Sequence, residues 1–101
     1  MKIEELSNAP YWLVEAKTKD ADVIVNDGEV LWFDGTWEDG DWRGGIFYDG
    51  TFAGGRFLSG EFRGGEFTGG SFWGGTWYGG KRNGGRWISG LMHTRIGPSP
   101  E

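Results

Sequence analysis

Glycine recurs at every fifth position from Gly35 to Gly90, and this period constrains the fold more than any other feature. A large apolar side chain follows two residues after nearly every one of these glycines. An α-helix returns a side chain to one face every 3.6 residues and a strand every two, so a period of five fits neither element. The large side chains share one side only if the chain turns once in each repeat. The unit G-x-[FW]-x-x therefore predicts a short extended piece followed by a corner.

The large side chains are mostly aromatic, with one basic residue near the end of the series. In chain order they are Trp37, Trp42, Phe47, Phe52, Phe57, Phe62, Phe67, Phe72, Trp77, Arg82, Trp87 and Met92. Buried without a partner, Arg82 would be costly, so we expect it to mark the opening of the last coil. We expect its guanidinium to stack on Phe62 or to reach water.

The residue before each periodic glycine is Asp, Ser or Gly, and these dipeptides favour turns. Glycine reaches positive φ without a Cβ clash, which a tight corner requires. Asp34, Asp39 and Asp49 each precede a turn glycine, and this position accounts for them without a metal ion.

Two all-β architectures satisfy this pattern. In one, the pentads wind into a β-solenoid with the aromatic side chains along its axis. In the other, three-residue strands zigzag through two-residue turns into a single-layer β-meander ribbon. The ribbon leaves its aromatic face open to water, whereas the solenoid buries the aromatic side chains by itself, so we favour the solenoid.

The unit resembles that of the pentapeptide-repeat family, in which a small residue and a Leu or Phe face the interior of a right-handed quadrilateral β-helix. Residues 21–25, Ala-Asp-Val-Ile-Val, match the family unit, and the later pentads carry Gly for the small residue and Phe or Trp for Leu. The chain is also similar to Gly-Thr-Trp repeat proteins of tailed phages, as in residues 75–79. The resemblance implies four pentads per coil and about three coils, with residues 20 apart stacked in columns. The expected core columns are Trp32/Phe52/Phe72/Met92, Trp37/Phe57/Trp77, Trp42/Phe62/Arg82 and Phe47/Phe67/Trp87.

The period divides the chain into three expected parts. Residues 1–21 form an N-terminal cap, residues 22–96 the pentad-repeat solenoid and residues 97–101 a flexible tail. Within the cap, residues 3–6 are expected to form a helical turn and residues 11–14 a strand. Residues 23–25 and 30–32 are expected to be strands of a wider first coil or of a capping hairpin.

Length and composition narrow the class of protein. A chain of 101 residues is one domain, and its lack of cysteine excludes disulfide and thiol chemistry. No apolar run is long enough to cross a bilayer, and the first residues do not resemble a signal peptide. We therefore expect a cytoplasmic or virion protein with no contact with a membrane.

Charge is distributed unevenly along the chain. Residues 1–50 contain 12 acids and 4 bases, whereas residues 51–101 contain 3 acids and 6 bases. In a solenoid this gives an acidic end and a basic end, which favours oriented docking of a protein partner, a homodimer or a head-to-tail oligomer. Direct binding of nucleic acid is not expected.

Three sets of residues are candidates for binding. Tyr48, Trp73 and Tyr78 directly follow core positions and are expected to form an exposed aromatic binding surface. The apolar residues near the C-terminus are expected to form an oligomer interface; they are Trp87, Ile88, Leu91, Met92 and Ile96. A third candidate is an anion contact formed by Lys81, Arg82 and Arg86.

Few residues in the sequence are suited to catalysis. His93 is the only histidine, and the segment from Gly75 to Arg82 lacks the Ser or Thr of a phosphate-binding loop. We expect no enzyme activity, no metal and no cofactor. The favoured function is a structural or protein-interaction module, and we consider a phage virion or contact with its host as its setting. The alternatives are a DNA-mimicking topoisomerase regulator and a carbohydrate-binding module.

Overall fold

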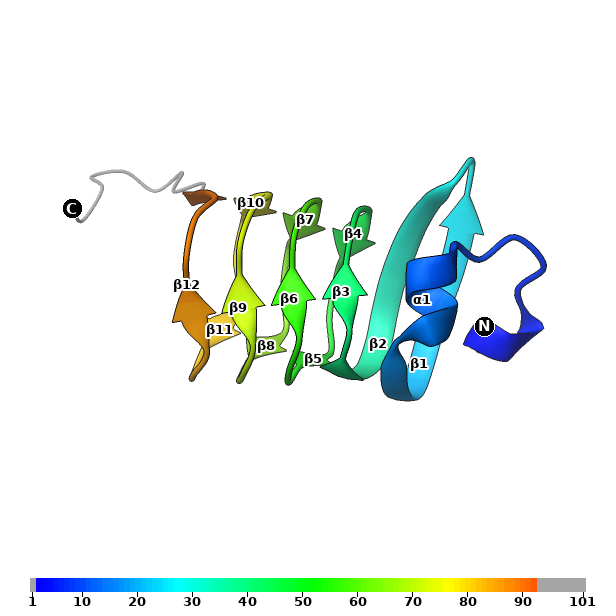
Figure 1. Ribbon diagram of the computed structural model, residues 1–101, viewed down its shortest axis with the longest axis horizontal. Coiled ribbons are helices and arrows are strands. Elements are labelled where there is room, and N and C mark those ends of the chain that lie inside the picture. Colours follow the sequence, from blue (N-terminus) through cyan, green and yellow to red (C-terminus); the bar gives the residue numbers. More distant parts are fainter. Residues whose placement is uncertain (1, 93–101) are drawn as a thin grey trace.

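The computed structural model describes residues 2–92 and shows a β-solenoid of about four turns with a mixed helix and strand cap at its N-terminal end (Figure 1). This confirms the solenoid and rules out the single-layer ribbon. The capping elements are η1 (Ile3–Glu5), α1 (Tyr11–Glu15) and β1 (Lys17–Asn26). The coils are formed by β2 (Glu29–Asp39), β3 (Asp41–Trp42), β4 (Ile46–Phe47), β5 (Thr51–Phe52), β6 (Arg56–Phe57), β7 (Glu61–Phe62), β8 (Glu66–Phe67), β9 (Ser71–Phe72), β10 (Thr76–Trp77), β11 (Lys81–Arg82), β12 (Arg86–Trp87) and β13 (Leu91–Met92).

Each coil contains three pentads, so the expected quadrilateral coil of four pentads is wrong. Parallel pairing joins residues 15 apart, as in Trp42 with Phe57 and Phe57 with Phe72. The core columns are therefore Trp32/Phe47/Phe62/Trp77/Met92, Trp37/Phe52/Phe67/Arg82 and Trp42/Phe57/Phe72/Trp87. A period of five divides both 15 and 20, so the glycine and aromatic positions alone are compatible with either number of sides.

Aromatic rings fill the inside of the solenoid. Within a column, rings of successive coils stack in parallel with centroids 4.4–5.8 Å apart and interplanar angles of 5–12°. Rings of successive pentads meet edge to face at 70–77°. Both are the favoured geometries for aromatic pairs. Three large rings thus close the cross-section of each coil, and the core side chains from Trp32 to Phe72 are fully buried.

The corners follow the predicted turn chemistry. Every periodic glycine from Gly35 to Gly90 has positive φ. Asp34, Asp39 and Asp49 each accept a hydrogen bond from the backbone N–H of the following glycine, at 2.9, 2.9 and 2.8 Å. These aspartates therefore act in turns, as the sequence predicted.

The N-terminal end is closed by elements of two kinds. β1 pairs antiparallel with β2, and the two strands form the expected capping hairpin. α1 lies beside β3 on the remaining side of the first coil (Figure 1). β1 spans the expected boundary between residues 21 and 22, and the expected tail at residues 97–101 lies outside the described residues.

Residues 11–14 begin a helix, α1, and not the predicted strand. Trp12 and Leu13 both pack inward, while Tyr11 and Val14 are exposed. Adjacent inward side chains fit a helix, whereas a strand would place them on opposite faces. The ring of Trp12 contacts Trp42 at a centroid distance of 5.3 Å, so burial against the first coil outweighs the strand propensity of these residues.

Candidate functional site

The residue after each core ring points outward, and residues 15 apart along the chain become surface neighbours. Phe33, Tyr48, Arg63 and Tyr78 form one such surface ladder. The rings of Phe33 and Tyr48 are parallel with centroids 5.2 Å apart, and the Arg63 guanidinium lies 4.5 Å from the centre of the Tyr78 ring. Sequence reasoning missed Phe33 and Arg63, because it sought neighbours 20 residues apart.

One face of each tyrosine ring in this ladder is already covered. Phe33 covers one face of Tyr48, and Arg63 covers one face of Tyr78. A flat ligand that stacked on either of these faces would have to displace an existing contact. The ladder therefore reinforces the alignment of the coils more directly than it offers a ligand site.

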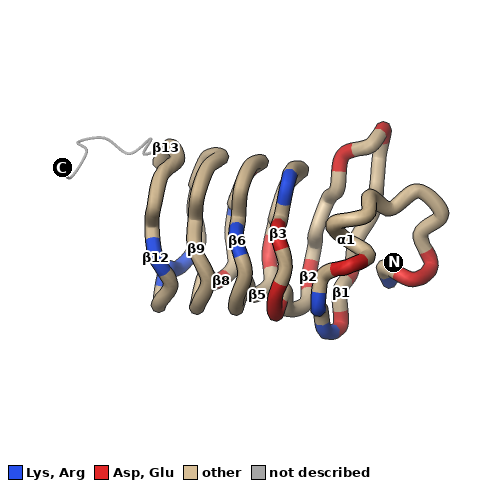
Figure 2. The backbone as a smooth tube through the Cα atoms, viewed as in Figure 1, with Lys and Arg blue, Asp and Glu red and all other residues tan. Residues whose placement is uncertain are grey.

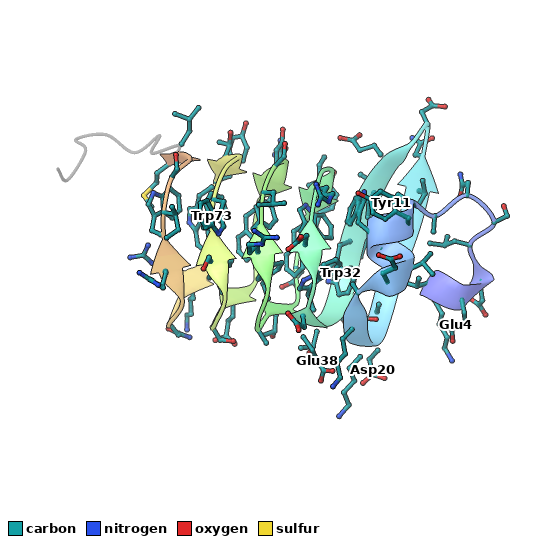
Figure 3. The ribbon with its side chains drawn as sticks, viewed as in Figure 1. Glu4, Tyr11, Asp20, Trp32, Glu38 and Trp73 are labelled. Atoms are coloured by element: carbon teal, nitrogen blue, oxygen red, sulfur yellow. The ribbon has the colours of Figure 1, made fainter. Side chains whose placement is uncertain are left out.

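Trp73 lies on a different side of the solenoid from Tyr48 and Tyr78. It shares a column with Leu58 and Ile88, because the amides of Trp73 and Ile88 donate to the carbonyls of Phe57 and Phe72, both at 2.8 Å. Trp73 lies on the coil that contains β9 (Figure 3). The structure thus separates the predicted aromatic set and places Trp73 next to Ile88 of the predicted interface.

The predicted interface residues come together at the C-terminal end of the solenoid. β11, β12 and β13 form the last edge of the three sides among residues 2–92. Leu91 is 70% exposed and Met92 53%, although Met92 occupies a core position in its column. Trp87 is partly buried and stacks on Phe72 at 4.4 Å. The fifth predicted member, Ile96, lies outside the described residues.

Three cations surround this open end. Arg82 occupies the core position next to Phe67, and not next to Phe62 as expected, because the coils contain 15 residues. Its side chain is exposed, and its guanidinium lies 5.8 Å from the centre of the Trp87 ring. Lys81 and Arg86 are exposed on β11 and β12, so the predicted anion contact and the predicted interface occupy the same end (Figure 2).

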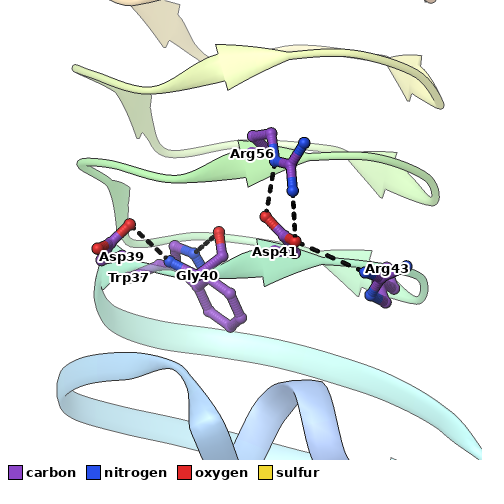
Figure 4. A network of polar contacts seen from close by, with 6 residues as sticks. All are labelled: Trp37, Asp39, Gly40, Asp41, Arg43 and Arg56. Atoms are coloured by element: carbon purple, nitrogen blue, oxygen red, sulfur yellow. Dashed lines mark hydrogen bonds and ion pairs between the residues drawn. The ribbon is translucent and has the colours of Figure 1, made fainter.

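A polar contact joins the surfaces of the first coil and the second. The Arg56 guanidinium on β6 donates two hydrogen bonds to the Asp41 carboxylate on β3, at 2.9 and 2.8 Å (Figure 4). Arg43 lies 3.6 Å from the same carboxylate. The hydrogen bond from Arg56 is the main cause that lowers the pKa of Asp41 below its ordinary value of 3.8.

The rest of the described chain has few features suited to binding a metal ion or a small ligand. Residues 2–92 contain no group of three or more side chains suited to hold a metal ion, and His93 lies beyond them. A hollow of about 420 Å³ lies in the cap between η1 and β1. It is open, and Lys2, Glu4 and Asp20 are among the residues that line it.

Comparisons with other proteins do not assign this chain to a family. No protein-family model matches the chain, and no curated protein and no solved structure is significantly similar to it. No helix in the described part of the chain is long and apolar enough to cross a membrane.

Proposed function

We propose that this protein is a non-enzymatic structural module that presents a protein-docking surface at the C-terminal end of a rigid solenoid. The observation that carries this proposal is the difference between the two ends. Leu13 and Trp12 cover the rings of the first coil, whereas Trp87, Leu91 and Met92 leave the last coil open.

Open solenoid ends are normally covered, because terminal repeats otherwise expose core side chains to water. Exposed apolar patches bordered by polar groups mark sites of protein interaction. The open end has this composition, with Ile88, Leu91 and Met92 beside Lys81 and Arg86. A virion or another large assembly is the setting we propose for such a module.

The other candidate functions have weaker support. A DNA mimic needs an extended acidic surface, yet residues 67–92 contain no aspartate or glutamate. A carbohydrate-binding face formed by Tyr48, Trp73 and Tyr78 lacks support, because Trp73 lies on a separate side from the two tyrosines.

Amide hydrogen exchange tests the proposal on the isolated protein. Amides of β11, β12 and β13 should exchange faster than those of β3, β6 and β9, because an uncovered end opens without disrupting inner coils. Acrylamide should quench the emission of Trp87 more than that of Trp32. Protection of β12 equal to that of β6 would contradict the proposal, because the end would then already be covered.

A further inference from the structure

We propose that the open end binds an acidic, strand-forming segment of a partner protein, which adds to the solenoid as its next coil. This inference rests on the proposed function and specifies the chemistry of the partner. The segment should carry large apolar side chains at five-residue spacing. The residues before its first two large side chains should be acidic, and the residue before its third should be apolar.

The inner coils supply the rule from which this pattern is derived. The residue before each core ring lies beside its equivalent in the next coil, and both pairs in which the two neighbours are charged, Asp41/Arg56 and Glu66/Lys81, are of opposite sign, although Ile46 lies beside Glu61 and Thr76 beside Leu91. Asp41 pairs with Arg56 through two hydrogen bonds, and Leu31 lies beside Ile46 in the parallel register. Cross-strand neighbours of opposite charge stabilise a sheet, whereas like charges destabilise it.

At the open end the equivalent positions are Lys81, Arg86 and Leu91. By the same rule, a coil that follows them should present an acid, an acid and an apolar residue. The backbone is also suited to accept a coil. Between the first two coils the amides of Arg56 and Leu58 donate to the carbonyls of Gly40 and Trp42, at 2.9 and 2.8 Å; β11 and β12 repeat both bonds, and the Leu91 amide of β13 donates to the Gly75 carbonyl at 2.9 Å.

The chain's own sequence after Met92 lacks the residues that another coil requires. Arg95 stands where the period requires glycine. At the equivalent Gly80, which has positive φ, an added Cβ would lie 2.7 Å from the carbonyl oxygen of Gly65. Pro98 stands where the inner coils use a backbone N–H donor, which proline does not have. The repeat pattern therefore ends while the edge of the last coil can still accept a strand.

A second copy fits this end poorly. Two open ends face to face would bring together Lys81, Arg82 and Arg86 of both copies, with no acidic residue in residues 67–92 to pair with them. In a head-to-tail stack the partner edge would be β1, which is irregular at three places in its register and has positive φ at Asp20. Irregular, charged edge strands resist pairing.

The size of the end also argues against stable self-association. The two shorter extents of the molecule, 24 and 19 Å, limit the footprint to about 460 Å² per partner. Stable protein interfaces bury about 1,200–2,000 Å² in total. A strand-forming segment adds backbone hydrogen bonds to this small area and can extend along the apolar column of Leu58, Trp73 and Ile88.

The test uses two labelled peptides and the full-length protein in a fluorescence polarisation titration. The acidic peptide has the sequence of residues 60–74 with leucine in place of Ser71, so that it presents Glu61, Glu66 and leucine before its three rings. The basic peptide is identical except for lysine in place of both glutamates. We expect the protein to bind the acidic peptide about tenfold or more tightly than the basic peptide, because two like-charge contacts replace two opposite ones.

Charge reversal at the open end provides the matched control. The Lys81→Glu/Arg86→Glu variant should prefer the basic peptide, whereas Lys17→Glu/Lys19→Glu, with the same change in net charge at the capped end, should keep the acidic preference. The net charge of −5 would by itself attract the basic peptide, so a preference for the acidic one must arise locally.

Every outcome of the titration decides the proposal. Binding of neither peptide, or equal binding of both, overturns it. A stable homodimer in light scattering that Leu91→Glu dissociates and Ile24→Glu does not would also overturn it, since a second copy would then occupy the end. Fast exchange of β12 together with absent peptide binding would refute this inference alone and leave the proposed function standing.

Discussion

The glycines are required at the residue scale for two separate reasons. Gly55 has a φ of +84°, and an added Cβ would lie 2.6 Å from the amide nitrogen of Gly40 in the preceding coil. Gly44 has no such φ and no atom within 4 Å of the Cβ position. The period in the sequence therefore marks where successive coils approach each other, and not only where the chain turns.

Gly55→Ala should lower the free energy of unfolding by at least about 2 kcal/mol, because backbone strain at positive φ adds to a clash with the preceding coil. Gly44→Ala is the matched control and should change it by less than about 1 kcal/mol. Urea denaturation monitored by tryptophan fluorescence measures both changes. Similar losses for the two variants would show that the coils are less closely spaced than described.

The contact between Asp41 and Arg56 predicts a pH dependence. Because the folded state lowers the pKa of Asp41, its contribution to stability is present above the ordinary value of 3.8 and is lost as the pH falls through the lower, folded value. Asp41→Asn should therefore destabilise the protein slightly at neutral pH, and its difference from wild type should shrink below pH 3.8. Urea midpoints over a pH series measure this, and a constant difference would refute the assignment.

At the scale of the strand, Arg82 interrupts an otherwise continuous column of rings. It stands next to Phe67, at the position that an aromatic residue fills in the three preceding coils of that column. The three successive strands β10, β11 and β12 therefore contribute two inward rings, Trp77 and Trp87, instead of three.

Arg82→Phe should stabilise the protein by about 1 kcal/mol, since a ring there can stack on Phe67 and contact Trp87. Lys81→Phe, on the same strand but facing outward, should give no comparable gain. Thermal unfolding of both variants measures the difference. An equal gain from Lys81→Phe would indicate a general effect of surface apolarity.

The cap at the other end depends on one fully buried side chain of α1. Leu13→Ala should cost about 2–5 kcal/mol, because it opens a cavity over the first coil. Val14→Ala, at an exposed position of the same helix, should change the stability by less than about 0.5 kcal/mol. Urea unfolding compares the two variants, and a negligible cost for Leu13→Ala would mean that the helix is not an essential cap.

At the scale of the whole molecule, much of the architecture was predictable because the repeat specifies its own packing. Glycine corners, an inward aromatic column and a distinct N-terminal cap follow from residue types and a single period. The number of sides did not follow, because all pentads look alike at the positions that define them. The outward positions discriminate only weakly: Asp41/Arg56 and Glu66/Lys81 are opposite in charge at a separation of 15 residues, and Glu61/Lys81 and Glu66/Arg86 are so at 20. Only the like-charged pair Asp41/Glu61 counts against a separation of 20.

The candidate site was predictable only in part, for a similar reason. Trp87, Ile88, Leu91 and Met92 are close in sequence, so any solenoid brings them to one end. The position of Trp73 could be predicted only with the correct coil length. With 15 residues per coil, Trp73 lies in the same column as Ile88. The strand predicted from the local sequence at residues 11–14 was also wrong. These aromatic and β-branched residues form a helix because two neighbouring side chains pack inward.

Removal of one coil tests the coil length. Deletion of residues 60–74 should give a folded, shorter solenoid with a lower urea m-value, because less surface is exposed on unfolding. Deletion of residues 60–66 is the control and should prevent regular folding after the deletion, because it moves the later glycines out of phase. Far-ultraviolet circular dichroism and urea titration compare the two, and equal behaviour would show that the period is dispensable.

The order of rings along the core has an optical consequence. Inward-facing tryptophans of the solenoid lie in the first coil at Trp32, Trp37 and Trp42 and near the open end at Trp77 and Trp87, and phenylalanines fill the core between them. Phenylalanine does not absorb at 295 nm, so light of this wavelength excites Trp12 and the first coil at one end and the region from Trp73 to Trp87 towards the other, and leaves the stretch between Trp42 and Trp73 dark. The capped end should emit at shorter wavelengths than the open one, and unfolding that starts at either end should change a different part of the emission spectrum.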